Sequence, residues 1–232
     1  SAEVSPLEVG KAFATLANNG VRTHPLAVKQ VVNHESQVLE KRDIRVKKVI
    51  TPQIAYMMNY LLKGVMDRGT GSYARRLGFT RPAAGKTGTT NDTRDAWFVG
   101  YTPDLLTVVW VGFDNQSKLD LSGALAALPI WTEFMKRATA GSPVVDFIPP
   151  VGIKMVDIDP QSGYLATPDC PQVIREAFFD GVWHVVGGDE SRCNAAGDVA
   201  SQQLPHRCGA KCIEPVGYLE GAAFHHDRTR AV

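Results

Sequence analysis

The sequence predicts a mixed α/β fold of the α+β type, with antiparallel strands packed by helices and a small β-rich extension at the C-terminal end. Three observations lead to this fold class. A capping residue followed by proline precedes apolar residues at helical spacing at positions 5–6 and 51–52. Residues 84–113 contain consecutive strand-like runs, and Pro129 marks a third helix start.

The first helix is expected to begin at Pro6 and to end at the Asn-Asn-Gly run of residues 18–20. Glu8 follows Ser5 by three residues, which is the spacing of a capping box. One face of this helix is apolar and consists of Leu7, Val9, Phe13, Leu16 and Ala17. Residues 21–32 are then expected to be extended, and residues 33–46 to form a hairpin or loop.

A second helix is expected from Pro52 to the glycine-flanked turn that contains Thr70. Its apolar residues recur at helical spacing and are Ile54, Met57, Met58, Leu61, Leu62 and Val65. Residues 72–81 are basic and predict a short helix that covers the site. Pro82 then returns the chain to an extended form.

The strand pattern begins at Ala84 and continues to Phe113, with a turn at residues 102–104. Three consecutive antiparallel strands are the natural interpretation, because short connections join neighbouring strands. Four aromatic side chains are expected in the core between sheet and helices: Trp97, Phe98, Trp110 and Trp131.

A last helix is expected after this sheet. Residues 117–127 are interpreted as a glycine-containing loop, and the helix is predicted to start at Pro129. Its packing face is predicted to consist of Ile130, Phe134 and Arg137.

Composition divides the chain into three parts. Residues 1–142 are expected to carry the main helices and strands, residues 143–190 to form a small extension with a strand near 153–159, and residues 191–232 to form a poorly ordered tail. All four cysteines fall in the last third: Cys170, Cys193, Cys208 and Cys212. In an exported protein we expect disulfides, whose pairing the sequence leaves open, and no metal site, since no C-x-x-C pair exists.

The charge balance excludes several classes of partner. With 25 basic and 24 acidic side chains and a net charge of +1, no global field attracts nucleic acid or an anionic membrane. No apolar run approaches the roughly 18 to 20 residues that a membrane span needs, so any anchor is expected outside this chain. Nothing in the sequence indicates a cofactor.

The strongest candidate site is the run Lys86-Thr87-Gly88-Thr89-Thr90, at the start of the strand pattern. In a strand, the side chains of Thr87 and Thr89 face the same side. Gly88 leaves room for the backbone of a substrate. Such a strand edge can pair with an extended peptide, bind its terminal carboxylate and polarise a carbonyl oxygen through a backbone N–H.

This run and its flanks resemble the later part of the transpeptidase domain of class A bifunctional penicillin-binding proteins. The similar segments appear in family order over roughly residues 1–140, and are residues 1–8, 14–20, 69–71, 85–90, 95–103 and 109–112. Residues 158–178 look like the C-terminal extension of many of these enzymes. The resemblance implies part of the penicillin-binding transpeptidase fold, which is shared with serine β-lactamases.

The resemblance also implies a reaction, which is acyl transfer on the D-Ala-D-Ala end of a peptidoglycan stem peptide through a serine ester that β-lactams trap. Lys86 and Gly88 would belong to the binding site, the Thr87 and Thr89 hydroxyls would bind the carboxylate, and the Thr89 N–H would be one of two oxyanion donors. Further cleft-lining residues are expected to be Gly69, Thr70, Gly71 and Thr90. The parent protein is expected to be membrane-anchored, to act outside the cytoplasm and to be a glycosyltransferase as well.

The nucleophile of this family is not in the sequence. No serine is followed three residues later by lysine, and no S-x-N occurs. We therefore expect a C-terminal fragment that cannot acylate alone and whose apolar surface is covered by the missing N-terminal half of the domain or by self-association. Two alternatives stay open: a serine β-lactamase relative, and a non-catalytic stem-peptide-binding or scaffolding module.

Overall fold

The computed structural model describes residues 3–181, with the exception of residues 91, 116, 162, 164, 167 and 169. The chain divides into two compact units, residues 1–153 and 154–232. The tail expected at 191–232, with three of the four cysteines, lies outside the described residues. Within the described ranges, none of the helices combines the length and apolarity that a membrane crossing requires.

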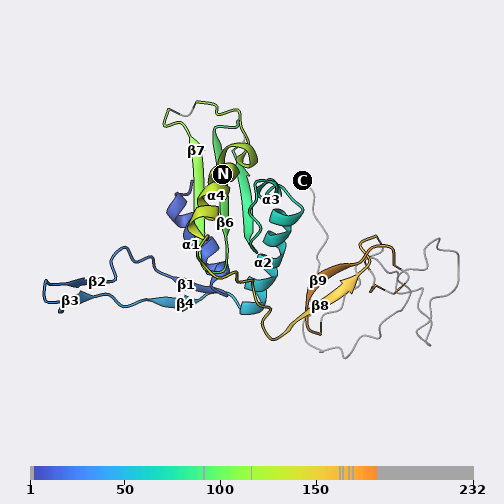
Figure 1. The fold of residues 1–232 in the computed structure, drawn as a ribbon, viewed down its shortest axis with the longest axis horizontal. Coiled ribbons are helices and arrows are strands. Elements are labelled where there is room, and N and C mark those ends of the chain that lie inside the picture. The colour runs from blue at the N-terminus through green and yellow to red at the C-terminus, as the bar shows by residue number, and fades with distance from the viewer. Residues whose placement is uncertain are drawn as a thin grey trace, which may run out of the picture. The chain divides into compact units, whose positions relative to one another are not determined.

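Three antiparallel strands form the central sheet of the first unit (Figure 1). They are β5 (Ala84–Thr89), β6 (Asp95–Tyr101) and β7 (Leu106–Gly112), and they lie side by side in chain order. Thr87 on β5 pairs with Phe98 on β6, which pairs with Val109 on β7. The predicted succession of three strands is confirmed, and β5 is an edge strand among the strands that the structure describes.

Two helices begin where the capping pattern predicts. At α1 (Pro6–Ala17), the Ser5 side chain accepts a hydrogen bond from the Glu8 N–H, and the Glu8 carboxylate accepts one from the Ser5 N–H at 2.8 Å. At α2 (Pro52–Asp67), the Thr51 side chain accepts from the Ile54 N–H. Side-chain caps of this kind satisfy backbone donors that have no partner within the helix. The short helix expected between residues 72 and 81 is α3 (Tyr73–Arg76).

The last helix, α4 (Gly123–Ala138), begins earlier than predicted. The expected loop over residues 117–127 is therefore wrong in its final part, and Pro129 lies inside the helix. Tertiary packing explains the difference, because Gly123 lies against β5 and β6, where a Cβ atom would come within 2.3 Å of the Trp97 carbonyl oxygen. Figure 1 shows α4 across the sheet and α2 beside β5.

The predicted packing face of α4 is also wrong. Ile130 and Phe134 are 54% and 50% exposed, and the side chain of Arg137 is 79% exposed. The sheet is instead covered by Ala127, Leu128, Trp131 and Met135, which are fully buried. Successive residues of a helix point about 100° apart, so an error of one residue moves the predicted apolar face to another side of the helix. The prediction that began at Pro129 therefore chose the wrong set of residues.

The core of the first unit is built around the indole ring of Trp131. The rings of Phe79 and Phe98 both meet it edge-on, with centroids 5.1 Å away. The expectation of a core position is confirmed for Phe98 and Trp131 and wrong for Trp110, which is 40% exposed. Trp97 is half-buried and lies 6.3 Å from Trp110, centroid to centroid.

A buried polar contact ties α1, α2 and β6 together. The Tyr101 hydroxyl donates to Asn59 Oδ1 at 2.6 Å, and Asn59 Nδ2 donates to the Leu16 carbonyl at 2.9 Å. Burial raises the pKa of the Tyr101 hydroxyl. Phe147, which follows α4 in the chain, packs edge-on against the Tyr101 ring, with the ring centroids 5.8 Å apart.

The hairpin expected after residue 32 is confirmed. Strand β1 (Val21–Thr23) pairs with β4 (Val46–Lys48), and β2 (Gln30–Val32) pairs with β3 (Val38–Lys41). Figure 1 shows these strands as a ribbon that leaves the body of the first unit, and β2, β3 and β4 are exposed throughout.

The second unit contains two paired strands among its described residues. They are β8 (Ile153–Ile158), which was predicted, and β9 (Ile174–Phe179), which was not. Lys154 and Asp180 form an ion pair at 3.2 Å. Cys170 is disulfide-bonded, as expected for an exported protein.

Candidate functional site

The edge strand β5 changes from buried to accessible along its length. Ala84 and Gly85 are buried, whereas Lys86 and Thr89 are exposed and Thr87 is half-buried. Lys86 Nζ donates to the carbonyl oxygen of Thr87 at 2.9 Å. The strand therefore begins in the core and places a cation and two hydroxyls at the surface.

The hydroxyl of Thr87 lies next to the turn that follows α2. Its Oγ1 is 2.9 Å from Thr70 Oγ1, so the two hydroxyls form a hydrogen bond. The structure thus brings the predicted cleft residue Thr70 to the predicted binding residue Thr87. Gly69 and Gly71 lie on either side, where a Cβ would come within 2.9 Å of Val65 Cα and 3.0 Å of Met66 Sδ respectively.

The hydroxyl of Thr89 lies at the first residue of α4. Thr89 Oγ1 accepts a hydrogen bond from the Gly123 N–H at 3.1 Å. The N-cap residue Ser122 makes no side-chain capping bond, so Thr89 satisfies a helix donor from outside the helix. Gly123 was missed from the sequence, where a Ser-Gly pair before an alanine-rich run was the available signal.

The predicted cleft residue Thr90 holds the turn between β5 and β6. Its Oγ1 accepts from the Arg94 N–H at 3.1 Å and from the Asp95 N–H at 2.9 Å. The carboxylate of Asp95, at the start of β6, accepts a hydrogen bond from Trp110 Nε1 on β7 at 2.8 Å. The Thr90 contacts therefore close the turn at the end of β5, and the Asp95 contact ties β6 to β7.

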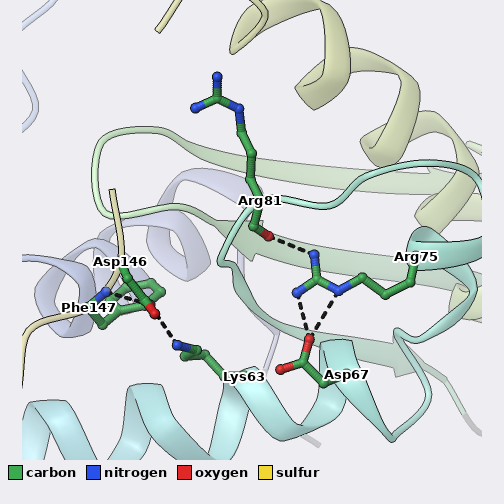
Figure 2. A network of polar contacts seen from close by, with 6 residues as sticks. All are labelled: Lys63, Asp67, Arg75, Arg81, Asp146 and Phe147. Carbon is green, nitrogen blue, oxygen red and sulfur yellow. Dashed lines mark hydrogen bonds and ion pairs between the residues drawn. The ribbon is translucent and has the colours of Figure 1, made fainter. Parts of the chain in front are cut away.

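A charged network holds the segment that leads into β5 (Figure 2). The guanidinium of Arg75 donates to Asp67 Oδ1 at 2.7 Å and 3.0 Å. The same group donates to the carbonyl oxygens of Phe79 at 2.9 Å and Arg81 at 2.6 Å. Lys63 and Asp146 form a separate pair at 2.6 Å, drawn in the same view.

Arg81 fastens this segment to the end of α4. Its guanidinium donates to the carbonyl oxygens of Thr139 at 2.6 Å and Pro143 at 2.8 Å. Carbonyls near a helix C-terminus lack partners within the helix, and a cation there is favourable. The basic residues at 75 and 81 therefore serve to position the site strand.

The arrangement has a clear chemical capacity. A threonine hydroxyl carries one donor and two acceptor positions, so Thr87 and Thr89 can donate to an anion while keeping the contacts described above. Lys86 adds an ammonium group on the same strand, and hydroxyl and ammonium groups are the kinds of donor that bind a carboxylate. In the described part of the chain, no group of three or more His, Cys, Asp or Glu side chains could hold a metal ion.

Two family profiles match the chain. The one described as "Penicillin binding protein transpeptidase domain" matches residues 1–136, and the one described as "Penicillin-binding protein 1A, C-terminal domain" matches residues 149–182. Penicillin-binding protein 1A of Aquifex aeolicus is 38% identical over 174 residues, which cover 74% of this chain and 24% of that protein. Penicillin-binding protein 1A of Pseudomonas aeruginosa is 31% identical over 230 residues, covering 77% and 28%. The chain thus spans about a quarter of the length of these relatives.

Solved structures agree on the fold. Penicillin-binding protein 1A from Haemophilus influenzae superposes with a TM-score of 0.69 at 24% identity, over 78% of this chain and 32% of that one, which shows the fold alone. PonA1 from Mycobacterium tuberculosis gives a TM-score of 0.52 at 30% identity, over 60% and 39%. The sheet and its helices are therefore those of a penicillin-binding transpeptidase, as the resemblance implied. With a family match over more than half of its length, the chain belongs to the penicillin-binding protein transpeptidase family.

Proposed function

We propose that this chain provides the substrate-binding side of a serine D-Ala-D-Ala transpeptidase that cross-links peptidoglycan in bacterial cell-wall synthesis. The observation that carries the proposal is the edge strand β5, which exposes Lys86 and holds the Thr87 and Thr89 hydroxyls against two neighbouring elements. Family membership supports the same activity class.

Each group on β5 has a role in this proposal. The free edge of the strand pairs with the extended stem peptide, as peptide ligands do at sheet edges. The ammonium of Lys86 and the hydroxyls of Thr87 and Thr89 bind the terminal carboxylate of the stem peptide or of a β-lactam. The Thr89 N–H donates to the oxygen on which negative charge develops.

The covalent step needs a serine that lies outside this sequence. The serine oxygen forms an ester with the penultimate D-Ala carbonyl, the peptide bond breaks, and the terminal D-Ala leaves with the proton. An amine of a second stem peptide then takes the acyl group, which frees the serine. With a β-lactam the same attack opens the ring, and the ester persists.

The remaining partners follow from this division of the site. The serine and its lysine base come from the N-terminal half of the domain, which packs against β5. The working protein acts outside the cytoplasm and is attached to the membrane through an anchor beyond this chain. In this proposal the 232-residue chain alone carries half a site and forms no acyl-enzyme.

Labelling with a fluorescent penicillin tests the proposal. The complete protein is expected to form a covalent adduct that survives denaturing electrophoresis, whereas the 232-residue chain forms none at the same protein and ligand concentrations. An adduct on the 232-residue chain would contradict the missing-nucleophile argument. Absence of an adduct on the folded complete protein, together with saturable reversible binding of a stem peptide, would favour a non-catalytic binding module.

A further inference from the structure

We infer that Thr70 is a positioning residue of the proposed site, and that the Asp67–Arg75 ion pair holds the turn that carries it. The inference rests on the proposed function, because it concerns how Thr87 meets a carboxylate. Its starting point is the contact between the two hydroxyls, with Thr70 Oγ1 2.9 Å from Thr87 Oγ1.

One hydrogen bond between two hydroxyls uses only one of the two hydrogens. A carboxylate accepts hydrogen bonds and cannot donate them. When it binds at Thr87, that hydroxyl must point its hydrogen at the carboxylate, so Thr70 must be the donor in the pair. Thr70 then polarises the Thr87 hydroxyl and strengthens the bond to the ligand, as in other chains of hydrogen bonds.

The turn that carries Thr70 is folded back onto the end of α2. The Gly69 N–H donates to the Gly64 carbonyl at 3.0 Å, and the Gly71 N–H donates to the Val65 carbonyl at 2.9 Å. A side chain at position 69 would collide with the Val65 backbone, and one at position 71 would crowd Met66 and Val65. The two glycines therefore let the turn lie close to α2, and Thr70 is held between two fixed points.

The ion pair closes the turn from outside. Asp67 is the last residue of α2, and Arg75 belongs to α3, so their contact at 2.7 Å spans the turn (Figure 2). Arg75 also donates to the carbonyls of Phe79 and Arg81, in the segment that runs into β5. One guanidinium thus holds both the turn with Thr70 and the approach to the strand with Thr87.

The position of Thr70 suits an experiment, because its side chain is exposed and its removal leaves the core intact. Thr70→Val deletes the hydroxyl and keeps the shape. We expect the second-order rate constant for acylation of the complete protein by labelled penicillin to fall about fivefold, which corresponds to about 1 kcal/mol. Thr70→Ser should restore most of the rate, since it keeps a hydroxyl.

A penicillin whose carboxylate is masked as a methyl ester separates positioning from a structural effect. It reacts more slowly with the wild-type protein, and Thr70→Val should lower its rate by less than twofold, because no carboxylate remains at Thr87. The matched control is Thr80→Val, an exposed threonine in the segment before β5, which should react like wild type with both ligands. Asp67→Asn should lower the free-acid rate as well, together with the melting temperature.

The outcomes distinguish this inference from the proposed function. Suppose that the wild-type protein is acylated and that Thr70→Val either keeps the wild-type rates or lowers the acylation rates for free acid and ester by the same factor. That result would overturn the role of Thr70 and leave the proposed function standing. A folded wild-type protein that is not acylated would overturn the proposed function itself. A selective loss with the free acid, restored in Thr70→Ser, is the result expected here.

Discussion

Replacing Gly123 by alanine tests whether the close approach of α4 holds the site strand in place. A Cβ at this position would lie 2.3 Å from the Trp97 carbonyl oxygen and 2.6 Å from the Gly88 carbonyl oxygen. Both are backbone atoms of the sheet and cannot turn aside as a side chain could. The start of α4 must therefore move away from β5, and the bond from the Gly123 N–H to Thr89 Oγ1 is lost.

Three contributions set the size of the effect. Overpacking of a tight contact costs about 1–3 kcal/mol, and the lost hydrogen bond costs about 1 kcal/mol more. Alanine is a better helix former than glycine by about 1 kcal/mol, which offsets part of this. The free energy of unfolding should therefore fall by about 1–3 kcal/mol, so the variant is expected to be less stable than wild type.

Urea unfolding of the 232-residue chain, followed by tryptophan fluorescence, to which the buried Trp131 contributes, measures the change in free energy. Acylation of the complete protein by labelled penicillin measures the effect on the site and should slow, because Thr89 is displaced. Gly141→Ala is the matched control, since a Cβ there would meet no atom within 4 Å. If Gly123→Ala were as stable and as reactive as wild type, the idea that α4 positions β5 would be refuted.

Two further predictions concern the supports of the sheet. Asn59→Ala leaves the Tyr101 hydroxyl and the Leu16 carbonyl without their hydrogen-bond partner. The free energy of unfolding, measured in urea, should therefore fall by about 2–5 kcal/mol. A loss below about 0.5 kcal/mol would contradict this hydrogen-bond network. The backbone N–H and hydroxyl of Ser5 hold the pKa of Glu8 below its ordinary value of 4.5. The stability that this carboxylate contributes is therefore present above pH 4.5 and is lost as the pH falls through the lowered pKa. The urea midpoints of wild type and Glu8→Gln should therefore differ at pH 7 and converge once the pH falls below the lowered pKa, and a constant gap would count against the capping box as the cause.

Features with a local cause were predictable from the sequence. The starts of α1 and α2 depend on a cap and a proline within a few residues, and both appear where they were expected. The strands β5 to β7 follow from alternation and β-branched runs, with short turns between them. These patterns hold because each is stabilised mainly by its own neighbours in the chain.

Features that depend on distant contacts were predicted poorly. The start of α4 is set by the packing of Gly123 on the sheet. Because glycine is a weak helix former, Pro129 was the stronger local signal for a helix start. Trp110 lies on the opposite face of β7 from Val109 and Val111, which pack on the core, and its size alone suggested burial.

The candidate site shows the same division. The alternation of Thr87 and Thr89 in β5 follows from the period of a strand. Their actual partners, Thr70 and Gly123, come from elements before and after the strand, and no local pattern specifies those hydrogen bonds. The role of Arg75 in holding the approach to β5 likewise needed the structure, since the sequence suggested only a basic helix near the site.

The most direct test of the central claim is the rate at which labelled penicillin acylates the complete protein carrying Lys86→Ala. If Lys86 belongs to the binding edge of the cleft, the second-order rate constant should fall by about 10- to 100-fold, because the substitution removes a charged donor to the carboxylate, which contributes about 1.5–3 kcal/mol. Lys47→Ala, on the exposed strand β4, is the control and should react like wild type. An unchanged rate for Lys86→Ala in a folded protein would contradict the assignment of β5 as the substrate-binding edge.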